Sequence, residues 1–461
     1  MAIEVSRRTI IQNKTSEMKT QILRDSPKEN VDSQNRKKME NILNELSGTD
    51  MSIAYEGIFG DTSLDVEQSL SKDSPIIIKG FSAILVNAVE MGATDIHIEA
   101  YEESVRIRYR VDGGLIEVKK LGKSVLNALV SRVKILSNLD IAERRLPQDG
   151  RMKLKIMGKD IDFRIAIMPT VFGEKVAIRI LDKTALDMKL DKLGFNEEEY
   201  EKIIKAISKP HGIILVTGPT GSGKSTTLYS ILNNLNTEDV NISTVEDPVE
   251  YNIDGINQVQ AKPEIGLTFA ASLRQFLRQD PDIIMVGEVR DGETAEIAIK
   301  AALTGHLVLS TLHTNDAVGT IFRLMNMGVQ PFLISASLVM VISQRLIRKL
   351  CPKCKEVDEE SSISLRILET DPREYWDKTF YKAGHNNDCP ICQGKGYKGR
   401  MAVHEIFIMN EEIRAMIDAG APLKDIEERA KVQGMQTLKK DGISKAAIGL
   451  TSLAEVVKIS Q

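Results

Sequence analysis

The sequence predicts an α/β protein in which a small α/β domain precedes a larger domain built on a parallel sheet. Three observations lead to this fold class. From about residue 200 onwards, apolar strand-like segments alternate with helical stretches, which is typical of a parallel sheet covered by helices. Between residues 75 and 186, an amphipathic helix precedes short segments of alternating polar and apolar residues, as in half-buried strands. Two C-x-x-C pairs between residues 351 and 392 indicate a small metal-stabilised insert.

The composition is that of a globular protein, and it argues against several classes of function. The 461 residues are 42% hydrophobic and 27% charged, well away from disordered or fibrous proteins. The 61 basic and 65 acidic residues give a net charge of −4, and 5% of the residues are aromatic. A protein held on nucleic acid by phosphate contacts and base stacking usually shows the opposite balance. Because no apolar run reaches the ~18 residues of a membrane span, and the start lacks the apolar core of a secretory signal, we expect a cytoplasmic protein.

Residues 1–74 are polar, and we expect this N-terminal segment to be largely flexible. Within it, four apolar residues fall at helical spacing: Met39, Ile42, Leu43 and Leu46. Such a short helix either packs on its own protein or docks on a partner, and the two alternatives are equally compatible with the pattern.

The small domain, residues 75–186, is expected to alternate helices with short strands. Asp112, Gly113 and Gly114 form a turn of the kind that joins hairpin strands. In chain order the expected elements are a helix at 76–91, strands at 95–99 and 105–110, a helix at 125–136, and strands at 160–167 and 175–181.

Asp95, His97 and Glu99 lie on one face of an expected strand and raise the question of a metal site. No further histidine or cysteine lies nearby in the sequence. An alternating polar face is more often a solvated or interface surface, so we favour that interpretation over a metal.

A strand at residues 212–217 runs directly into a G-x-x-x-x-G-K-[ST] loop, which a helix at 228–235 follows. Glycines let successive backbone N–H groups turn inward around a phosphate, and the start of the helix adds partial positive charge. Lys224 would place a full charge between the β- and γ-phosphates, and the Ser225 hydroxyl would bind Mg²⁺. The expected nucleotide-binding residues are Gly218, Pro219, Thr220, Gly221, Ser222, Gly223, Lys224, Ser225 and Thr226.

Three further segments carry polar groups that suit nucleotide hydrolysis. A buried strand at 282–288 ends in Glu288, which would either position a Mg²⁺-bound water or polarise the attacking water. Residues 243–251 carry three acids around a proline, and one of these carboxylates would orient water or magnesium. The strand within residues 304–315 ends at His313, in a polar cluster suited to sensing the γ-phosphate.

These motifs resemble the Walker A, Asp box, Walker B and His box of the bacterial type II/type IV secretion ATPases. They occur in that order at residues 218–226, 244–251, 277–291 and 304–317. The similarity extends outside this core, to residues 94–100, 108–113, 146–151 and 434–443. It covers roughly residues 75–461.

The resemblance implies a hexameric, Mg²⁺-dependent ATPase. A RecA-like ATPase domain, residues 200–461, would follow a smaller PAS-like domain, residues 75–186, and the two would rotate about a flexible linker at 187–199. Active sites would lie between the two domains. Arg164 and Arg179 of the smaller domain would neutralise charge on the phosphates as the γ-phosphoryl group leaves.

The same resemblance implies roles for the other polar residues. Glu250 and Glu288 match the catalytic carboxylates, and His313 matches the residue nearest the γ-phosphate. Three arginines match family arginines at the nucleotide or the subunit interface: Arg274, Arg278 and Arg290.

All four cysteines form two C-x-x-C pairs, Cys351 with Cys354 and Cys389 with Cys392. Two such pairs complete a tetrahedral S₄ zinc site with no open position, so the metal would be structural. The insert at 351–392 would depend on this zinc for its folding. By resemblance, such an insert is typical of assembly and secretion ATPases of the GspE and PilB kind, whereas retraction ATPases generally lack it.

The sequence therefore predicts a homo-hexameric motor that uses ATP, Mg²⁺ and structural Zn²⁺. It would power type IV pilus or pseudopilus assembly, or type II secretion, at the inner face of the cytoplasmic membrane through platform components embedded there. Many family members also carry a folded N-terminal docking domain, for which residues 1–74 are too short and too polar. The alternatives are a RecA-like motor on nucleic acid and a scaffold that binds nucleotide without hydrolysing it; the charge balance disfavours the first, and the set of catalytic groups disfavours the second.

Overall fold

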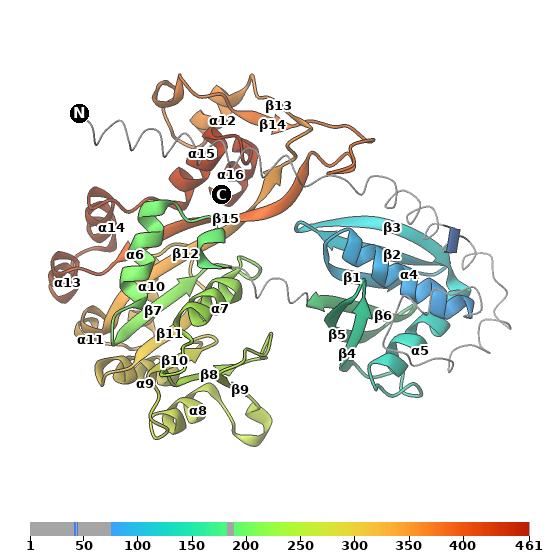
Figure 1. Ribbon diagram of the computed structural model, residues 1–461, viewed down its shortest axis with the longest axis horizontal. Helices are drawn as coiled ribbons and strands as arrows, with labels where there is room; N and C mark the ends of the chain where they lie inside the picture. The colour runs from blue at the N-terminus through green and yellow to red at the C-terminus, as the bar shows by residue number, and fades with distance from the viewer. Residues whose placement is uncertain (1–40, 43, 45–74, 182–188, 461) are drawn as a thin grey trace. The chain divides into compact units, whose positions relative to one another are not determined.

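The computed structural model divides the chain into two compact units, residues 1–181 and 182–461. Figure 1 shows the helices and strands of both, and each unit is described here by itself. The described residues are 41, 42, 44, 75–181 and 189–460.

Most of the expected N-terminal segment, 1–74, therefore lies outside the described residues. Of the helix expected there, residues 41, 42 and 44 are helical, and Ile42 is buried in the core of the first unit. The first two positions of the expected linker, 187 and 188, also lie outside the described part of the chain.

Between residues 75 and 181, the first unit contains one antiparallel sheet with two α-helices packed on it. Its strands follow the order β3-β2-β1-β6-β5-β4, and every neighbouring pair is antiparallel. The elements are α4 (Ile76–Glu90), β1 (Ala93–Ala100), β2 (Ser104–Val111), β3 (Gly114–Gly122), η2 (Lys123–Val125), α5 (Leu126–Leu136), β4 (Gln148–Ile156), β5 (Lys159–Thr170) and β6 (Gly173–Leu181).

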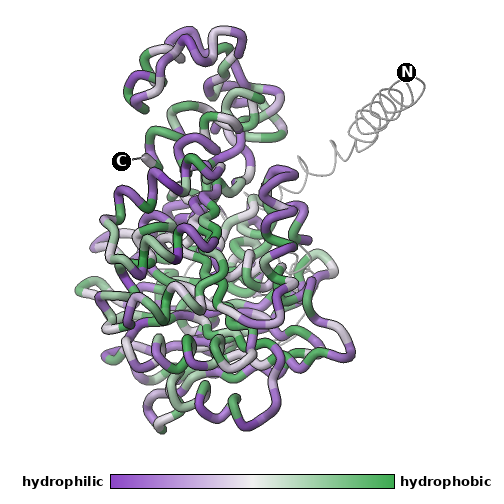
Figure 2. Tube along the Cα trace, turned by 90° about the vertical axis from the view of Figure 1, so that its left-hand side faces the viewer, coloured by the Kyte–Doolittle hydropathy of each residue, from purple (hydrophilic) through white to green (hydrophobic). Residues whose placement is uncertain are grey.

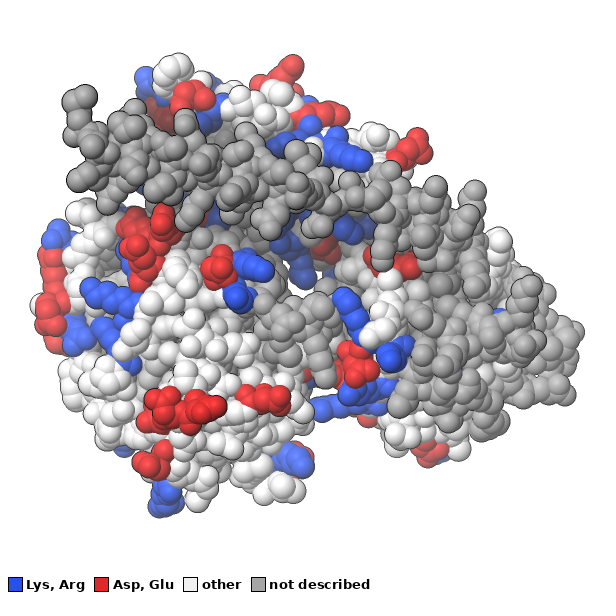
Figure 3. Space-filling model, in the orientation of Figure 1, with Lys and Arg blue, Asp and Glu red and all other residues white. Residues whose placement is uncertain are grey.

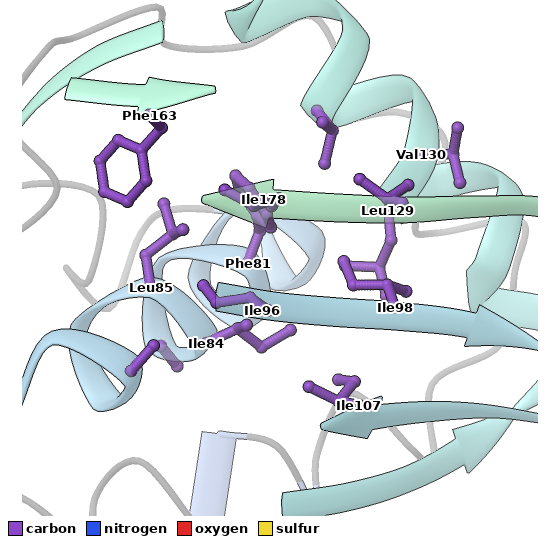
Figure 4. Packing of buried hydrophobic residues seen from close by; sticks show 14 of the residues in the cluster. Phe81, Ile84, Leu85, Ile96, Ile98, Ile107, Leu129, Val130, Phe163 and Ile178 are labelled. Carbon is purple, nitrogen blue, oxygen red and sulfur yellow. The ribbon is translucent and has the colours of Figure 1, made fainter. Parts of the chain in front are cut away.

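Alternation along the strands decides which face of this sheet is buried. In β2 the apolar side chains are buried and the three arginines between them are not. The apolar face packs against α4 and α5, and Figure 4 shows Phe81 and Ile84 of α4 beside Ile96 of β1. Each buried side chain of this size contributes about 1.5–3 kcal/mol by leaving water. The helices and strands expected from the sequence are confirmed here, and β3 and β4 are additional.

The second unit is larger and carries the parallel sheet that the sequence predicts. The strand order is β15-β12-β7-β11-β10-β8-β9, with β12 to β9 parallel and β15 antiparallel at one edge. Its elements up to the end of β12 are η4 (Leu190–Lys192), α6 (Glu197–Ile207), β7 (Gly212–Thr217), α7 (Lys224–Leu235), β8 (Ile242–Glu246), β9 (Ile256–Gln260), η5 (Pro263–Ile265), α8 (Phe269–Phe276), β10 (Ile283–Val286), α9 (Gly292–Leu303), β11 (Leu307–Leu312), α10 (Gly319–Asn326), α11 (Pro331–Ser337) and β12 (Leu338–Leu350).

Helices cover both faces of this sheet, as buried parallel strands require. Along β7, Ile213 and Leu215 belong to a core that includes residues of α9, α10 and the later helix α13 (Glu411–Asp418). Ile214 and Val216 face the opposite way, into a core that includes residues of α6 and α7. The α/β class with a helix-covered parallel sheet is therefore confirmed.

The cysteine-bearing insert connects the neighbouring antiparallel strands β12 and β15. None of the helices in the described part of the chain is both long enough and apolar enough to span a membrane. Figure 2 shows polar and apolar residues alternating at short intervals along the trace. The remaining elements are β13 (Lys355–Val357), α12 (Ser361–Ile367), η6 (Pro372–Tyr375), β14 (Tyr381–Ala383), β15 (Tyr397–Ile408), α13 (Glu411–Asp418), α14 (Leu423–Val432), α15 (Leu438–Ala447) and α16 (Leu453–Ser460).

Candidate functional site

The glycine-rich loop lies between the buried strand β7 and the first turn of α7. Gly221 and Gly223 have φ angles of 80° and 90°, a region that residues with a Cβ rarely adopt. Because α7 begins at Lys224, its first backbone N–H groups have no partners within the helix and can bind an anion. The strand–loop–helix arrangement is therefore that of a phosphate cradle.

Gly218 is required for a second reason, which is close packing. A Cβ at this position would come within 2.5 Å of the carbonyl oxygen of Gln344 and 2.6 Å of the Ser222 hydroxyl. The loop therefore packs closely against the middle of β12.

Lys224 holds its ammonium group over the loop. Its Nζ donates to the carbonyl oxygens of Gly218 at 2.8 Å and Pro219 at 3.2 Å. Burial lowers the pKa of Lys224, while the carboxylate of Glu288 acts in the opposite sense. Ser225 follows in the first turn of α7 and is exposed. A phosphate in the cradle would meet both the ammonium and this hydroxyl.

Three polar residues converge where neighbouring strands end. Asp247 follows β8, Glu288 follows β10 and His313 follows β11. Nε2 of His313 lies 3.6 Å from one Glu288 oxygen. Arg290 donates a hydrogen bond to the other Glu288 oxygen and lies 3.7 Å from Asp247. The carboxyl ends of parallel strands are where α/β proteins bind their ligands, so these groups and the phosphate cradle share one edge of the sheet.

The backbone of Glu250 belongs to a buried hydrogen-bond network that the sequence did not reveal. The Tyr229 hydroxyl of α7 donates to Glu246 and accepts from the backbone N–H of Glu250 at 3.1 Å. Glu246, 4% exposed, also accepts from the Thr244 hydroxyl at 2.7 Å and the Gln258 amide at 3.1 Å. Burial and the neighbouring Glu246 charge raise the pKa of Tyr229, so its hydroxyl remains a donor. This network ties the acidic segment to the helix that follows the phosphate cradle.

We expect Tyr229→Phe to lower the free energy of unfolding by about 1–3 kcal/mol, because one Glu246 oxygen and the Glu250 N–H lose their partner. Chemical denaturation of the variant would measure this loss, and the ATPase rate should fall with it. Tyr375→Phe is the matched control, since within the described residues the Tyr375 hydroxyl makes no hydrogen bond. Equal stability of Tyr229→Phe and wild type would contradict the role given to this hydroxyl.

Arg164 and Arg179 lie in the first unit, whereas the cradle lies in the second. They are directly opposite one another on β5 and β6. Arg179 also forms an ion pair with Asp95 at 3.0 Å. The register extends this row across the sheet, in the order Arg151, Arg164, Arg179, Asp95 and Arg110. Strand alternation in the sequence suggested a polar face, but only the strand order brings these arginines into one row.

The acidic residues that raised the question of a metal are engaged in ion pairs. Glu99 accepts two hydrogen bonds from Arg108, at 2.8 and 2.9 Å, and lies 3.2 Å from Arg106. His97 lies between Asp95 and Glu99, and burial lowers its pKa. The polar face of this strand is thus cross-linked to the arginines of β2. Of the other arginines, Arg274 pairs with Glu293 in the second unit, and Arg278 is exposed.

The four cysteines meet in one buried cluster. Their Sγ atoms all lie within 4.8 Å of one another, with Cys351 and Cys389 at 3.8 Å and Cys354 and Cys392 at 3.5 Å. A tetrahedral zinc with bonds of about 2.3 Å spaces its sulfur ligands by about 3.8 Å, so the cluster fits this ion. The backbone N–H of Cys392 lowers the pKa of Cys389, whereas burial raises the pKa of Cys351 and the hydrogen bond with Cys389 raises that of Cys354. Cys389 is thus the thiol that most readily forms the thiolate that binds metal.

Comparisons with known proteins find relatives over most of the chain. The family model for type II/IV secretion system proteins matches residues 70–458. The chain is 48% identical over 421 residues to the type IV pilus assembly ATPase PilB of Myxococcus xanthus, covering 88% of this chain and 73% of the relative. It is 47% identical over 391 residues to the type II secretion system ATPase E of Vibrio cholerae, covering 85% and 76%.

Solved structures resemble the fold as well. The pilus retraction motor PilT with bound ADP is 28% identical, with a TM-score of 0.55 over 82% of this chain and 95% of that one. The ATPase DotB of Legionella pneumophila, at 24% identity, supports the fold alone, with a TM-score of 0.62 over 82% and 94%.

Proposed function

The chain belongs to the type II/IV secretion system protein family and is a P-loop ATPase, and from this premise we propose that it is a hexameric, Mg²⁺-dependent motor for type IV pilus assembly or type II secretion. One observation carries the mechanism: the phosphate cradle, Glu288 and His313 share the carboxyl edge of one parallel sheet.

In this mechanism the loop and Lys224 bind the β- and γ-phosphates of ATP. The backbone N–H groups of residues 220–226 surround the phosphates, and the Lys224 ammonium exchanges its two carbonyl partners for phosphate oxygens. The Ser225 hydroxyl and the carboxylates beyond the strands are oxygen ligands of the kind that Mg²⁺ prefers. A bound Mg²⁺ would neutralise part of the charge that develops on the phosphates.

Glu288 is the proposed group that orients and polarises the attacking water. Its side chain is 19% exposed; Arg290 donates a hydrogen bond to one of its oxygens, and Nε2 of His313 lies 3.6 Å from the other. Glu250 is the second proposed carboxylate, and the Tyr229 network fixes its backbone. His313 would then sense the γ-phosphate, because it is 54% exposed beside Glu288.

Arg164 and Arg179 are proposed to complete the site from the smaller domain. In other P-loop enzymes, an arginine from another domain or protein neutralises charge on the leaving γ-phosphoryl group. This arginine accelerates hydrolysis by about 10³–10⁵-fold. Arg179 forms an ion pair with Asp95, so a phosphate would have to compete with this carboxylate for the guanidinium.

Glu288→Gln should lower steady-state phosphate release by about 10²–10⁴-fold, the usual contribution of general-base catalysis. Binding of a fluorescent ATP analogue should change little, because the amide keeps the size of the side chain and the cradle is intact. Glu296→Gln is the control, since this exposed glutamate pairs only with Lys300 on α9 among the described residues. Wild-type turnover by Glu288→Gln would refute the assignment of the base.

The apparatus and its partners are proposed from the relatives. The chain is nearly equally identical to a pilus assembly ATPase and to a type II secretion ATPase, so a role in either apparatus is supported. The protein would act as a homo-hexamer at the inner face of the cytoplasmic membrane, held there by membrane-embedded platform components. Deleting the gene in its host and scoring surface pili against secreted proteins would distinguish the two machines.

A motor on nucleic acid would need a track of basic side chains for the phosphates. On the face shown in Figure 3, basic and acidic side chains are interspersed, in keeping with the 61 basic and 65 acidic residues of the chain. Salt-sensitive stimulation of the ATPase by DNA or RNA is the result that would replace the proposed function with this alternative.

A further inference from the structure

Two consecutive residues of β12, just beyond the part of the strand that pairs with β7, contact two different loops of the active site. Side chains alternate between the faces of a strand, so Gln344 and Arg345 point to opposite sides of the sheet. Gln344 contacts the phosphate loop, and Arg345 contacts the loop between β11 and α10, which carries His313.

Gln344 is almost fully buried, with 1% of its surface exposed. Its Nε2 donates to the carbonyl oxygen of Ser222 at 2.6 Å, and its Oε1 accepts from the Thr227 hydroxyl at 2.8 Å. Both ends of the amide are therefore used, one on the loop and one on α7. A glutamate at this position would lack the donor for Ser222, because an ionised carboxylate only accepts.

Arg345 makes the corresponding contact on the other side. It donates to the backbone oxygen of Asn315 at 2.9 Å and lies 3.3 Å from the Asn315 side-chain oxygen. Its second guanidinium nitrogen donates to the Gln344 carbonyl oxygen at 3.2 Å. Glu405, opposite Ser343 on β15, adds a further contact to this loop by accepting from the Ala317 N–H at 2.7 Å.

Resting on the proposed binding of ATP at the phosphate loop, we propose that Gln344 and Arg345 form a coupling bracket. Gln344 sets the shape of the phosphate loop, and Arg345 holds the His313 loop at a fixed position relative to it. Both are positioning residues, because each acts through a loop rather than on the reacting atoms.

The physical basis is the rigidity of a central strand compared with two loops. The two residues share one peptide unit of β12, which pairs there with β15 and directly follows Ser343, the last residue of β12 that also pairs with β7. A phosphate that reorders the backbone at Ser222 changes the contacts of the Gln344 side-chain amide. Arg345 donates a hydrogen bond to the backbone carbonyl oxygen of Gln344, so it is linked to the same residue. Binding at one loop should therefore stabilise the other, since a ligand shifts only the states with which it interacts differently.

Hydrogen exchange with and without a non-hydrolysable ATP analogue and Mg²⁺ tests the bracket. In the wild-type protein the analogue should slow exchange in peptides covering both residues 218–223 and residues 313–317. At saturating analogue, Arg345→Met should retain the first effect and lose at least about four-fifths of the second. Gln344→Glu should weaken ADP binding at least tenfold, whereas Gln344→Met, which removes both hydrogen bonds without adding a charge, should weaken it less.

Arg348→Met is the matched control for the arginine. It lies on the same strand but bonds to Glu455, at 2.6 Å, rather than to an active-site loop. The hydrogen-exchange response of Arg348→Met at both loops should match that of the wild type. This result would show that damage to β12 alone does not remove the response at residues 313–317. Zinc content and melting temperature report folding of each variant.

A wild-type response at both loops in Arg345→Met would overturn the bracket while leaving the proposed function intact. Unchanged ADP affinity in Gln344→Glu would also count against it. Failure of the wild-type protein to bind the analogue would instead overturn the proposed function and, with it, the bracket.

Discussion

Replacing Lys224 by alanine should lower the rate of ATP hydrolysis by about 10²–10³-fold, as loss of a preorganised donor to a developing charge does in other enzymes. The ammonium group is held over the loop by two carbonyl oxygens, so it is positioned before nucleotide arrives. Its removal leaves the phosphate charges to the backbone N–H groups and the dipole of α7, which supply only about half a positive charge. Steady-state phosphate release at saturating ATP would measure the effect.

Lys205→Ala is the matched control for this substitution. Lys205 is an exposed lysine of α6, and within the described residues it takes part in no hydrogen bond or ion pair. The control should hydrolyse ATP at the wild-type rate. Turnover by Lys224→Ala at more than a tenth of that rate, or an equal loss in the control, would contradict the assignment of the phosphate cradle.

The cradle could be predicted from the sequence because its determinants are local. A strand, a glycine-rich loop and a helix within residues 212–235 are set by neighbouring residues, and the structure has them in that arrangement. The same holds for the helix-covered parallel sheet, since continuous apolar strands alternate with helical segments in the sequence.

Gln344 could not be found in this way, because it contacts Ser222 and Thr227 from more than 110 positions away in the chain. In the sequence it only ends an apolar run. Tyr229 is similar: its position on α7 is predictable, but its contact with Glu246 depends on β8 being the third strand from β7, beyond β11 and β10. A buried polar residue needs partners, and the sequence alone does not say which strand will supply them.

The arginine row of the first unit shows the same limit. Alternation predicts that Arg164 and Arg179 lie on the polar faces of their strands. That they face each other, with Asp95 as a partner, follows from the pairing of β6 with both β5 and β1.

Removing zinc should unfold the insert between β12 and β15, the second large effect that we expect after that of Lys224→Ala. Purified protein should hold about one zinc per chain, and Cys389→Ser should lose most of it. A structural zinc site contributes on the order of 10 kcal/mol to folding, more than a short insert with a small apolar cluster can replace. Chelation or Cys389→Ser should therefore expose residues 351–396 to protease and to hydrogen exchange, while β7 at the centre of the sheet stays protected.

The control for the metal site is His385→Ala. His385 lies four residues before Cys389, and its Nδ1 lies 3.1 Å from the carbonyl oxygen of Gly394. If four sulfurs complete the coordination sphere, this variant should keep its zinc, because a closed tetrahedral site needs no further ligand. Zinc below about a tenth of an ion per chain in protein purified without chelator, or loss of metal from His385→Ala equal to that from Cys389→Ser, would rule out the S₄ assignment. In the first case the insert would be held by its own packing, and chelation would leave its protease resistance unchanged.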